Sequence, residues 1–337
     1  MRGLRTSIKA ALWTAQLLIL GGWVWLFLES RAPRPSPRPA GPAVFEIERG
    51  WTVRTVADEL KSRGLIRKTT PFVLFYEFFH APRSLKAGEY ELPAGARTRE
   101  ILGLFVGGRI RLHPLTVPEG LTGAETAEVF AAAGFETREA FLSAFAATET
   151  VALLDPRAAD LEGYLFPETY HFSKGTTAAE AVERMTSQFK SVFSPAWRRR
   201  AAELSLDVRE VVTLASLIEK ETASPEEKPL VSAVFHNRLK LGMKLDCDPT
   251  VIYALKKLGP WNGRLRTKDL KLDSPYNTYL YPGLPPGPIC NPGRASLEAA
   301  LHPSEADYLY FVSRNDGTHV FSRTLREHAT AVLQYQR

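Results

Sequence analysis

The chain has 337 residues, 45% hydrophobic and 24% charged, which is the composition of an ordinary globular protein with room for two domains. Its net charge of +6 is modest and spread along the chain, so it suits an anionic polymer or a membrane surface. No cluster of basic and aromatic residues argues for nucleic acid as a partner.

The N-terminus predicts a membrane anchor. Residues 1–10 are basic, and an uncharged stretch of about 18 residues follows at 11–28. As a helix this stretch is about 27 Å long, close to the thickness of a bilayer core. A cleaved signal peptide is the alternative, but no small-x-small site follows cleanly, which favours an uncleaved transmembrane helix. The short basic N-terminus favours a cytoplasmic location for residues 1–10, with everything beyond residue 30 outside the inner (plasma) membrane.

Residues 29–43 are rich in proline and predict an extended, semi-rigid linker. Residues 44–108 predict a small α+β module, in which strand, helix, helix, strand and helix follow one another. The segments are VFEIERG (44–50), TVRTVADELKSRGLI (52–66), TPFVLFYEFF (70–79), LKAGEYELPAG (85–95) and RTREILGLFVGG (97–108). This order resembles a LysM-like module, a class that binds N-acetylated glycan chains. A packing subdomain without a ligand is the alternative, and periodicity does not separate the two.

A larger domain at 109–337 is predicted to begin with a strand at 109–117, followed by helices within 118–135 and 138–153. The next segment, 161–175, is aromatic and contains Tyr164 and Glu168. Aromatic faces stack on sugar rings, and carboxylates accept hydrogen bonds from sugar hydroxyls. A hydrophobic strand with solvated acidic residues is the alternative. The pattern at 177–202 predicts one amphipathic helix.

The central stretch, 207–241, predicts two helices. Asp207 with Glu210 has the spacing of a capping box. Ser224 with Glu227 predicts a second capping box, in which Pro225 would take the first helical position. The first of these helices carries the candidate catalytic residue.

Glu219 continues an apolar stripe on that helix, because Val208, Val212, Ala215 and Glu219 share one face on a period of 3.6 residues. Burial disfavours the carboxylate, and so does the negative end of the helix dipole. We therefore expect Glu219 to stay protonated near neutral pH, as a general acid in glycosidic bond cleavage must.

Glu221 is the competitor in the same motif. It lies roughly opposite Glu219, on the side of Leu214 and Leu217, by the 100° step of a helix. A structural contact at the helix end is the role we expect for it. A third interpretation is that neither acid is catalytic and both pair with Lys or Arg.

The last third of the chain predicts a helix starting at Asp248-Pro249-Thr250, a short helix at 296–301, a hairpin around 308–322 and a final amphipathic helix. Between the first two lies a run at 274–293 that is crowded with Pro, Gly, Asn and Tyr. Such a run excludes regular helix, and its length favours a functional loop over a connector.

No metal or cofactor site is expected. The two cysteines, Cys247 and Cys290, have no metal-ligand spacing, and neither do the seven histidines. The sequence also has no phosphate-binding Gly-rich loop, Ser-His-Asp pattern or HExxH motif. Outside the cytoplasm the cysteines can form a disulfide, and otherwise they are two small buried residues.

Several motifs in order resemble the MltG (YceG-like) endolytic murein transglycosylases over roughly residues 40–337. They are LASLIEKETASPEEKPLVSAVFHNRL, DPTVIYAL, SPYNTYLYPGLPPGPICNPG, and YLYFV followed by GTHVF. The resemblance implies an α+β fold with an N-terminal transmembrane helix, a small LysM-like module and a larger mixed α+β catalytic domain with a lysozyme-like catalytic-Glu helix.

The resemblance also implies a lyase that cuts β-1,4 bonds between N-acetylmuramic acid and N-acetylglucosamine inside nascent peptidoglycan strands. The family's essential Glu falls on Glu219. This residue would protonate the leaving oxygen and then, as a carboxylate, take a proton from the muramoyl C6 hydroxyl to give a 1,6-anhydro end. Such an enzyme is expected near peptidoglycan synthases, where it would end glycan elongation. Candidate substrate contacts are Tyr276, Asn277, Thr278, Glu168 and Tyr164.

Two other functions are compatible with the motifs. One is a hydrolysing muramidase with a second carboxylate, for which Asp246, Asp248 and Glu168 are the candidates. The other is a non-enzymatic glycan-binding scaffold for wall synthesis. Products with 1,6-anhydro ends distinguish the lytic transglycosylase from both of these alternatives.

Overall fold

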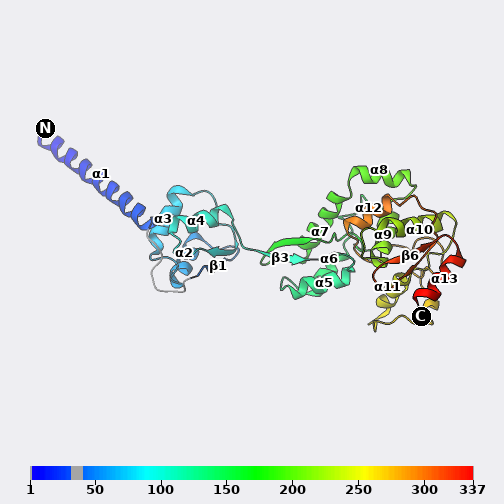
Figure 1. The fold of residues 1–337 in the computed structure, drawn as a ribbon. Coiled ribbons are helices and arrows are strands. Elements are labelled where there is room, and N and C mark those ends of the chain that lie inside the picture. The colour runs from blue at the N-terminus through cyan, green and yellow to red at the C-terminus, as the bar shows by residue number, and fades with distance from the viewer. Residues whose placement is uncertain (1, 32–40, 337) are drawn as a thin grey trace. The chain divides into compact units, whose positions relative to one another are not determined.

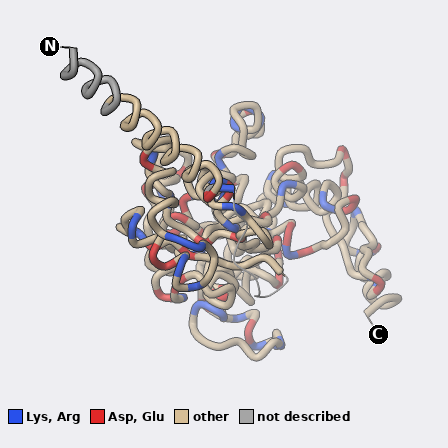
Figure 2. Tube along the Cα trace, turned by 90° about the vertical axis from the view of Figure 1, so that its left-hand side faces the viewer, with Lys and Arg blue, Asp and Glu red and all other residues tan. Residues whose placement is uncertain are grey.

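The computed structural model describes residues 2–31 and 41–336, and these divide into two compact units (Figure 1). The N-terminal unit comprises residues up to 113 together with 171–175, and the C-terminal unit comprises 114–170 and 176–337. Lys, Arg, Asp and Glu are interspersed along the described chain (Figure 2), in agreement with a net charge that is spread rather than clustered.

The N-terminal unit begins with a single long helix, α1 (Arg2–Arg31). Its stretch from Leu12 to Glu29 is long and apolar enough to cross a membrane. The C-terminal end of α1 packs on the module that follows, because Trp23 contacts Phe78 and Phe79 at ring-centroid distances of 5.0 and 5.7 Å. The predicted linker falls largely on residues 32–40, which lie outside the described residues.

The module has the predicted order of elements. They are β1 (Ala43–Ile47), α2 (Val53–Ser62), α3 (Thr69–Phe79), β2 (Gly88–Leu92) and α4 (Thr98–Gly107). β1 pairs with β2 in antiparallel register, with Phe45 opposite Tyr90. Both side chains are fully buried and contact Phe105 of α4, so burial of these three rings fixes α4 against the sheet. The likeness to LysM modules remains a prediction.

The C-terminal unit is a mixed α+β domain, as predicted. Its strands are β3 (Leu112–Thr116), β4 (Thr169–Ser173), β5 (Tyr310–Ser313) and β6 (His319–Ser322), with β3 beside β4 and β5 beside β6. Its helices are α5 (Gly123–Ala132), α6 (Arg138–Phe145), α7 (Ala178–Val192), α8 (Pro195–Glu203), α9 (Val208–Glu221), α10 (Lys228–Lys240), α11 (Asp248–Leu258), η1 (Asp269–Lys271), α12 (Arg294–Leu301) and α13 (Leu325–Tyr335). Residues 112–113 of β3 and 171–173 of β4 are counted with the N-terminal unit.

Two helix predictions were wrong in detail. The single helix predicted at 177–202 is broken into α7 and α8, because Ser194 takes an extended conformation and caps α8, with Pro195 at its first position. The second predicted capping box does not form either. The helix α10 begins at Lys228, and the carboxyl of Glu227 instead accepts hydrogen bonds from Thr222 and from the backbone N–H of His319.

Helix α9 is the core of the C-terminal unit. The capping box of Asp207 and Glu210 is present at its start, as predicted. Every residue from Val211 to Ile218 is buried, and α9 packs against α8, α10, α11 and α12 (Figure 1). The apolar stripe predicted for α9 is therefore not its only buried face, because the middle of the helix is buried on all sides. The helix face on which each acid lies therefore does not show which of Glu219 and Glu221 is the catalytic residue.

Candidate active site

The carboxyl group of Glu219 lies near the C-terminal end of α9, where its side chain is only 8% exposed. Four hydrogen bonds reach it. Lys228 Nζ lies 3.2 Å from each oxygen, and Oε2 also accepts from the backbone N–H of Gly293 at 3.0 Å and from Ser296 Oγ at 2.6 Å. The expectation of apolar neighbours was therefore wrong, because the side chain ends in a pocket of donors.

Two of these donors belong to the first turn of α12. Gly293 is the N-cap residue of that helix and has no side chain with which to cap it. The carboxylate of Glu219, on α9, takes the role of the missing capping side chain and accepts hydrogen bonds from the Gly293 N–H and the Ser296 hydroxyl. Backbone N–H groups at a helix N-terminus bind negatively charged groups, and the carboxyl of Glu219 occupies that position on α12.

Lys228 supplies the counter-charge. It is the first residue of α10, and its side chain is 4% exposed. A buried ammonium is costly unless it is paired, and here it is paired with Glu219. The same Nζ lies 3.9 Å from a carboxylate oxygen of Glu119.

Glu119 stands in the turn Pro118-Glu119-Gly120 that follows β3, and its side chain is half exposed. Partial burial raises the pKa of Glu119, the charge of Glu219 raises it further, and Lys228 acts in the opposite direction. The carboxyl group packs directly on the Cα of Gly293, where any Cβ would overlap it. The site therefore holds two carboxyl groups beside one ammonium.

Asn291 holds the segments around the site together. Its backbone pairs with the turn after β3: Gly120 N–H donates to the Asn291 carbonyl at 2.9 Å, and Asn291 N–H donates to the Leu121 carbonyl at 2.8 Å. Its side-chain oxygen accepts from the N–H groups of Gly163 and Leu165 at 2.9 and 3.0 Å. Asn291 is fully buried, so these bonds fix the loops that carry Glu119 and Gly293.

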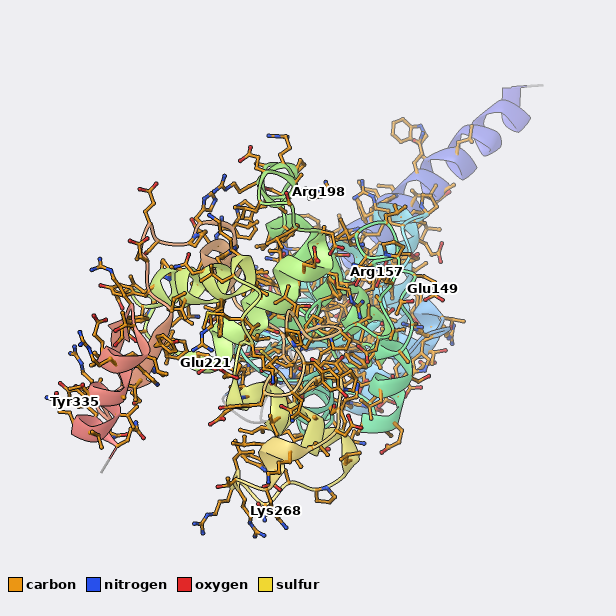
Figure 3. All side chains as sticks on the ribbon, turned by 90° about the vertical axis from the view of Figure 1, so that its right-hand side faces the viewer. Glu149, Arg157, Arg198, Glu221, Lys268 and Tyr335 are labelled. Atoms are coloured by element: carbon orange, nitrogen blue, oxygen red, sulfur yellow. The ribbon has the colours of Figure 1, made fainter. Side chains whose placement is uncertain are left out.

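Glu221 makes the structural contact predicted for it. The thiol of Cys247 donates a hydrogen bond to its carboxyl at 2.9 Å, and burial raises the pKa of Glu221 to about 7. The side chain lies at the C-terminal end of α9 (Figure 3). None of the hydrogen bonds described for Glu221 reaches Lys228 or Ser296, so it belongs to a different cluster from Glu219.

Three of the five predicted substrate contacts are buried. Tyr164 is 1% exposed and donates to Asp155, Asn277 is fully buried and donates to the carbonyls of Leu270 and Leu272, and Thr278 accepts from Cys247 N–H. All three side chains therefore make their described contacts inside the protein.

The other two predicted contacts are more accessible. Glu168 is exposed, and Tyr276 is partly buried with its ring 4.9 Å from that of Tyr253. Hydrogen bonds described for the five residues do not reach Glu219, Lys228 or Glu119.

Two of the three acids considered as a second carboxylate form contacts elsewhere. Asp246 forms an ion pair with Arg238 at 3.0 Å, and Asp248 accepts from the hydroxyl of Tyr279 at 2.6 Å. The carboxyl beside Glu219 is instead Glu119, which the sequence reasoning missed together with Lys228. The available signal was the Pro118-Glu119-Gly120 turn directly before a capping box at Thr122.

Cys247 and Cys290 are buried free thiols, so the disulfide is not present. Cys247 bonds Glu221, and Cys290 donates to the carbonyl of Ser216 at 3.4 Å. Among the residues that the structure describes, no group of three or more His, Cys, Asp or Glu side chains is arranged to hold a metal ion.

Comparisons with known proteins agree on one family. The model of the YceG-like family matches residues 45–334. An endolytic murein transglycosylase of Bacillus subtilis (strain 168) is 34% identical over 309 residues, which cover 86% of this chain and 84% of that protein. An endolytic murein transglycosylase of Streptococcus pneumoniae (strain D39) is 32% identical over 321 residues, and the match covers 86% of this chain but 57% of that longer protein. The crystal structure of a yceG-like protein from Listeria monocytogenes superposes with a TM-score of 0.59 at 31% identity, covering 87% of this chain and 99% of the other.

Proposed function

Because the chain belongs to the YceG-like family, we infer that it is an endolytic murein transglycosylase, a lyase that cuts glycan strands of peptidoglycan. The observation that supports a place for the chemistry is the buried carboxyl of Glu219. It is held by Lys228, Gly293 and Ser296, at the meeting point of three helices.

We propose that Glu219 is the catalytic acid and base. In its protonated form it donates its proton to the glycosidic oxygen between N-acetylmuramic acid and N-acetylglucosamine, and the bond from that oxygen to C1 of the muramoyl sugar breaks. The resulting carboxylate removes the proton of the muramoyl C6 hydroxyl, and O6 closes onto C1 as a 1,6-anhydro ring. The proton that left Glu219 is replaced by the one it accepts, and no water is consumed. One carboxyl therefore suffices, whereas hydrolytic glycosidases use two.

The donors around Glu219 suit the second half of this cycle. Once the proton has left, the carboxylate is stabilised by the Lys228 ammonium, the Ser296 hydroxyl and the Gly293 N–H. These groups are already in position before reaction, so no reorganisation is needed when the charge appears. They also fix the carboxyl in one place, which a proton transfer to a bound glycan requires.

Other parts of the chain support the placement of this reaction at a cell wall. The apolar helix α1 suits a single-pass anchor in the inner membrane, with a cytoplasmic N-terminus and the catalytic unit outside. The module at 44–108 suits glycan binding of the LysM kind, and Tyr276 and Glu168 remain the accessible candidates for substrate contacts. An enzyme so anchored would act on nascent strands near peptidoglycan synthases and would end their elongation.

Product analysis tests the proposal. Full-length protein in detergent is incubated with purified murein sacculi, and the released fragments are separated and weighed by mass spectrometry. We expect fragments of several disaccharides that end in 1,6-anhydro-N-acetylmuramic acid. Fragments heavier by one water, with reducing ends as in a parallel digest by a hydrolytic muramidase, would contradict the lytic mechanism. Release of single disaccharides alone would contradict internal cleavage.

A further inference from the structure

The contacts of Glu219 pose a problem for the first chemical step. A general acid must carry a proton, yet an ammonium, a helix N-terminus and a hydroxyl donor all stabilise the ionised carboxylate. Of the effects described so far, only the burial of the side chain disfavours the charged carboxylate. Some other group is needed to offset Lys228 if Glu219 is to hold a proton before the substrate is cut.

Glu119 is the group that meets this requirement. Its carboxyl lies 3.9 Å from the same Nζ of Lys228 that bonds both oxygens of Glu219. The two carboxyls therefore compete for one buried cation, and like charges this close repel each other. Burial and the charge of Glu219 raise the pKa of Glu119, but half of the Glu119 side chain still faces solvent, whereas the side chain of Glu219 is 8% exposed.

We propose that Glu119 is a second carboxyl of the active site and that it favours the protonated form of Glu219. Its negative charge attracts the Lys228 ammonium, which then stabilises the Glu219 carboxylate less, and it repels a second negative charge on Glu219. The inference rests on the proposed role of Glu219. Glu119 does not react with the glycan itself. It is a positioning residue, whose charge keeps the proton on Glu219. It neither gives up nor gains a proton in the cycle, so the proton balance of the reaction is unchanged.

The surroundings keep Glu119 in this place. Its carboxyl lies on the Cα of Gly293, which leaves no room for a Cβ, and the next residue, Gly120, has the positive φ of +77° that the turn requires. The Gly120 N–H and the Leu121 carbonyl are both bonded to the backbone of Asn291. Asn291 therefore fixes both the turn that carries Glu119 and the segment that leads into α12.

The charged groups that face this turn come from two helices. Helix α9 contributes Glu219 and Lys220, whose ammonium donates to the Gly120 carbonyl at 3.3 Å, and α10 contributes Lys228. On α12, the guanidinium of Arg294 lies over the ring of Trp197 at 5.4 Å. Glu119 is the acidic group among them that faces both Lys228 and Glu219, and the repulsion between the two carboxyls is mutual.

The test is the pH dependence of Glu119→Gln in the full-length protein. The amide has the same shape without the charge. Release of anhydro-ended fragments is followed from pH 4.5 to 8.5 for this variant, for wild type and for Glu226→Gln. The last removes one exposed carboxyl two residues before Lys228 and is the matched control.

We expect the alkaline limb of the Glu119→Gln profile to move to lower pH by about one unit, which is the lower bound for a like charge within about 10 Å at an effective dielectric constant of about 20. Activity near pH 7.5 should fall about tenfold, and activity on the acid side should stay within about threefold of wild type. Glu226→Gln should follow wild type at every pH. Thermal unfolding of each variant verifies that it is folded.

A second variant tests the geometry. In Gly293→Ala the new methyl group overlaps the carboxyl end of Glu119, which must leave its present position beside Lys228. We expect its alkaline limb to move in the same direction. A limb that stays in place in both variants overturns the proposal, and so does a loss by one constant factor at every pH, which would indicate a purely structural role. Complete loss at every pH for a folded Glu119→Gln protein would also overturn it, since that marks a group that reacts with substrate.

Failure of the proposed function has a different signature. It would give reducing ends from wild-type protein, or activity in Glu219→Gln. Failure of this inference leaves the wild-type products and the inactivity of Glu219→Gln intact and affects only the limb of the Glu119→Gln profile.

Discussion

The ammonium of Lys228 lies 3.2 Å from both carboxylate oxygens of Glu219, and the two side chains are 4% and 8% exposed. A pair removed from water in this way is held by its partners, because either charge alone would be costly. The pair joins the end of α9 to the start of α10 and leaves the carboxyl at a fixed position beside α12.

Removing the ammonium should therefore destabilise the protein. We expect Lys228→Met to lower the free energy of unfolding by about 3 kcal/mol, because the carboxyl of Glu219 remains buried without its counter-charge. Urea unfolding of the full-length protein at pH 7.5 measures the loss. Lys220→Met is the matched control on the neighbouring exposed lysine, and it should cost less than about 1 kcal/mol. Equal losses in the two variants would show that burial of the pair has no special cost.

The stability of the protein should also depend strongly on Asn291. Asn291→Ala removes the acceptor of the Gly163 and Leu165 N–H groups and leaves both donors buried without a partner, while the Leu121 carbonyl keeps its bond to the backbone N–H of residue 291. We expect a loss of about 3 kcal/mol in denaturant unfolding, since each buried unpaired group costs about 1–3 kcal/mol. The exposed Asn262 offers the control, and Asn262→Ala should be nearly neutral. A small effect of Asn291→Ala would mean that the loops it joins are held by other contacts.

Stability should fall as the pH rises from about 5 to 8. Burial raises the pKa of Glu162 to about 8 and that of Glu221 to about 7, from an ordinary value of 4.5. Between 4.5 and these values the folded protein binds protons that the unfolded chain has released, so the free energy of unfolding decreases with pH, by up to about 1.4 kcal/mol per unit for each group. This stabilisation is complete below pH 4.5 and is lost through pH 7 and 8.

Glu162→Gln should flatten that slope. The amide keeps an acceptor for the Gly123 N–H but no longer titrates. Urea unfolding at pH 5, 6, 7 and 8 compares the variant with wild type and with Glu203→Gln, which removes an exposed carboxyl. Parallel slopes for wild type and Glu162→Gln, or stability that increases across this range, would contradict the burial of a protonated carboxyl at Glu162.

The two cysteines should behave as free thiols. Protein unfolded in guanidinium without reductant should take up two maleimide groups per chain, as a reduced sample does, while native protein should label slowly because both thiols are buried. Cys247→Ser with Cys290→Ser should leave transglycosylase activity nearly unchanged, since serine retains a donor for Glu221. Labelling that requires prior reduction would show a disulfide instead.

Much of the fold follows from local patterns. The order of elements in the module at 44–108, the capping box at Asp207 and the hairpin β5–β6 were all predicted, because caps, turns and alternation are encoded within a few residues. The break between α7 and α8 also has a local signal, Ser194-Pro195, which the continuous amphipathic pattern concealed.

The site was harder to predict, because its geometry depends on contacts distant in sequence. Glu219 was selected from a one-sided stripe, yet α9 is buried all round, and its end meets donors that come from α10 and α12. Glu119 lies about a hundred residues before Glu219, so no periodicity joins them. Asn277 and Thr278 stand in a polar loop that looks accessible in sequence, but their side chains bond the loop's own backbone and that of Cys247.

The central claim is that Glu219, and not its neighbour Glu221, carries the proton, and the most direct measurement compares Glu219→Gln with Glu221→Gln in the release of anhydro-ended fragments from sacculi. Both substitutions keep the shape of the side chain, and the amide of Glu221→Gln retains an acceptor for the Cys247 thiol. We predict that Glu219→Gln lowers the rate at least about a thousandfold while remaining folded, since a missing proton donor and base costs about 10²–10⁴-fold for each role, and that Glu221→Gln stays within a few-fold of wild type. Substantial activity in Glu219→Gln, or an equal loss in the two variants, would contradict the account.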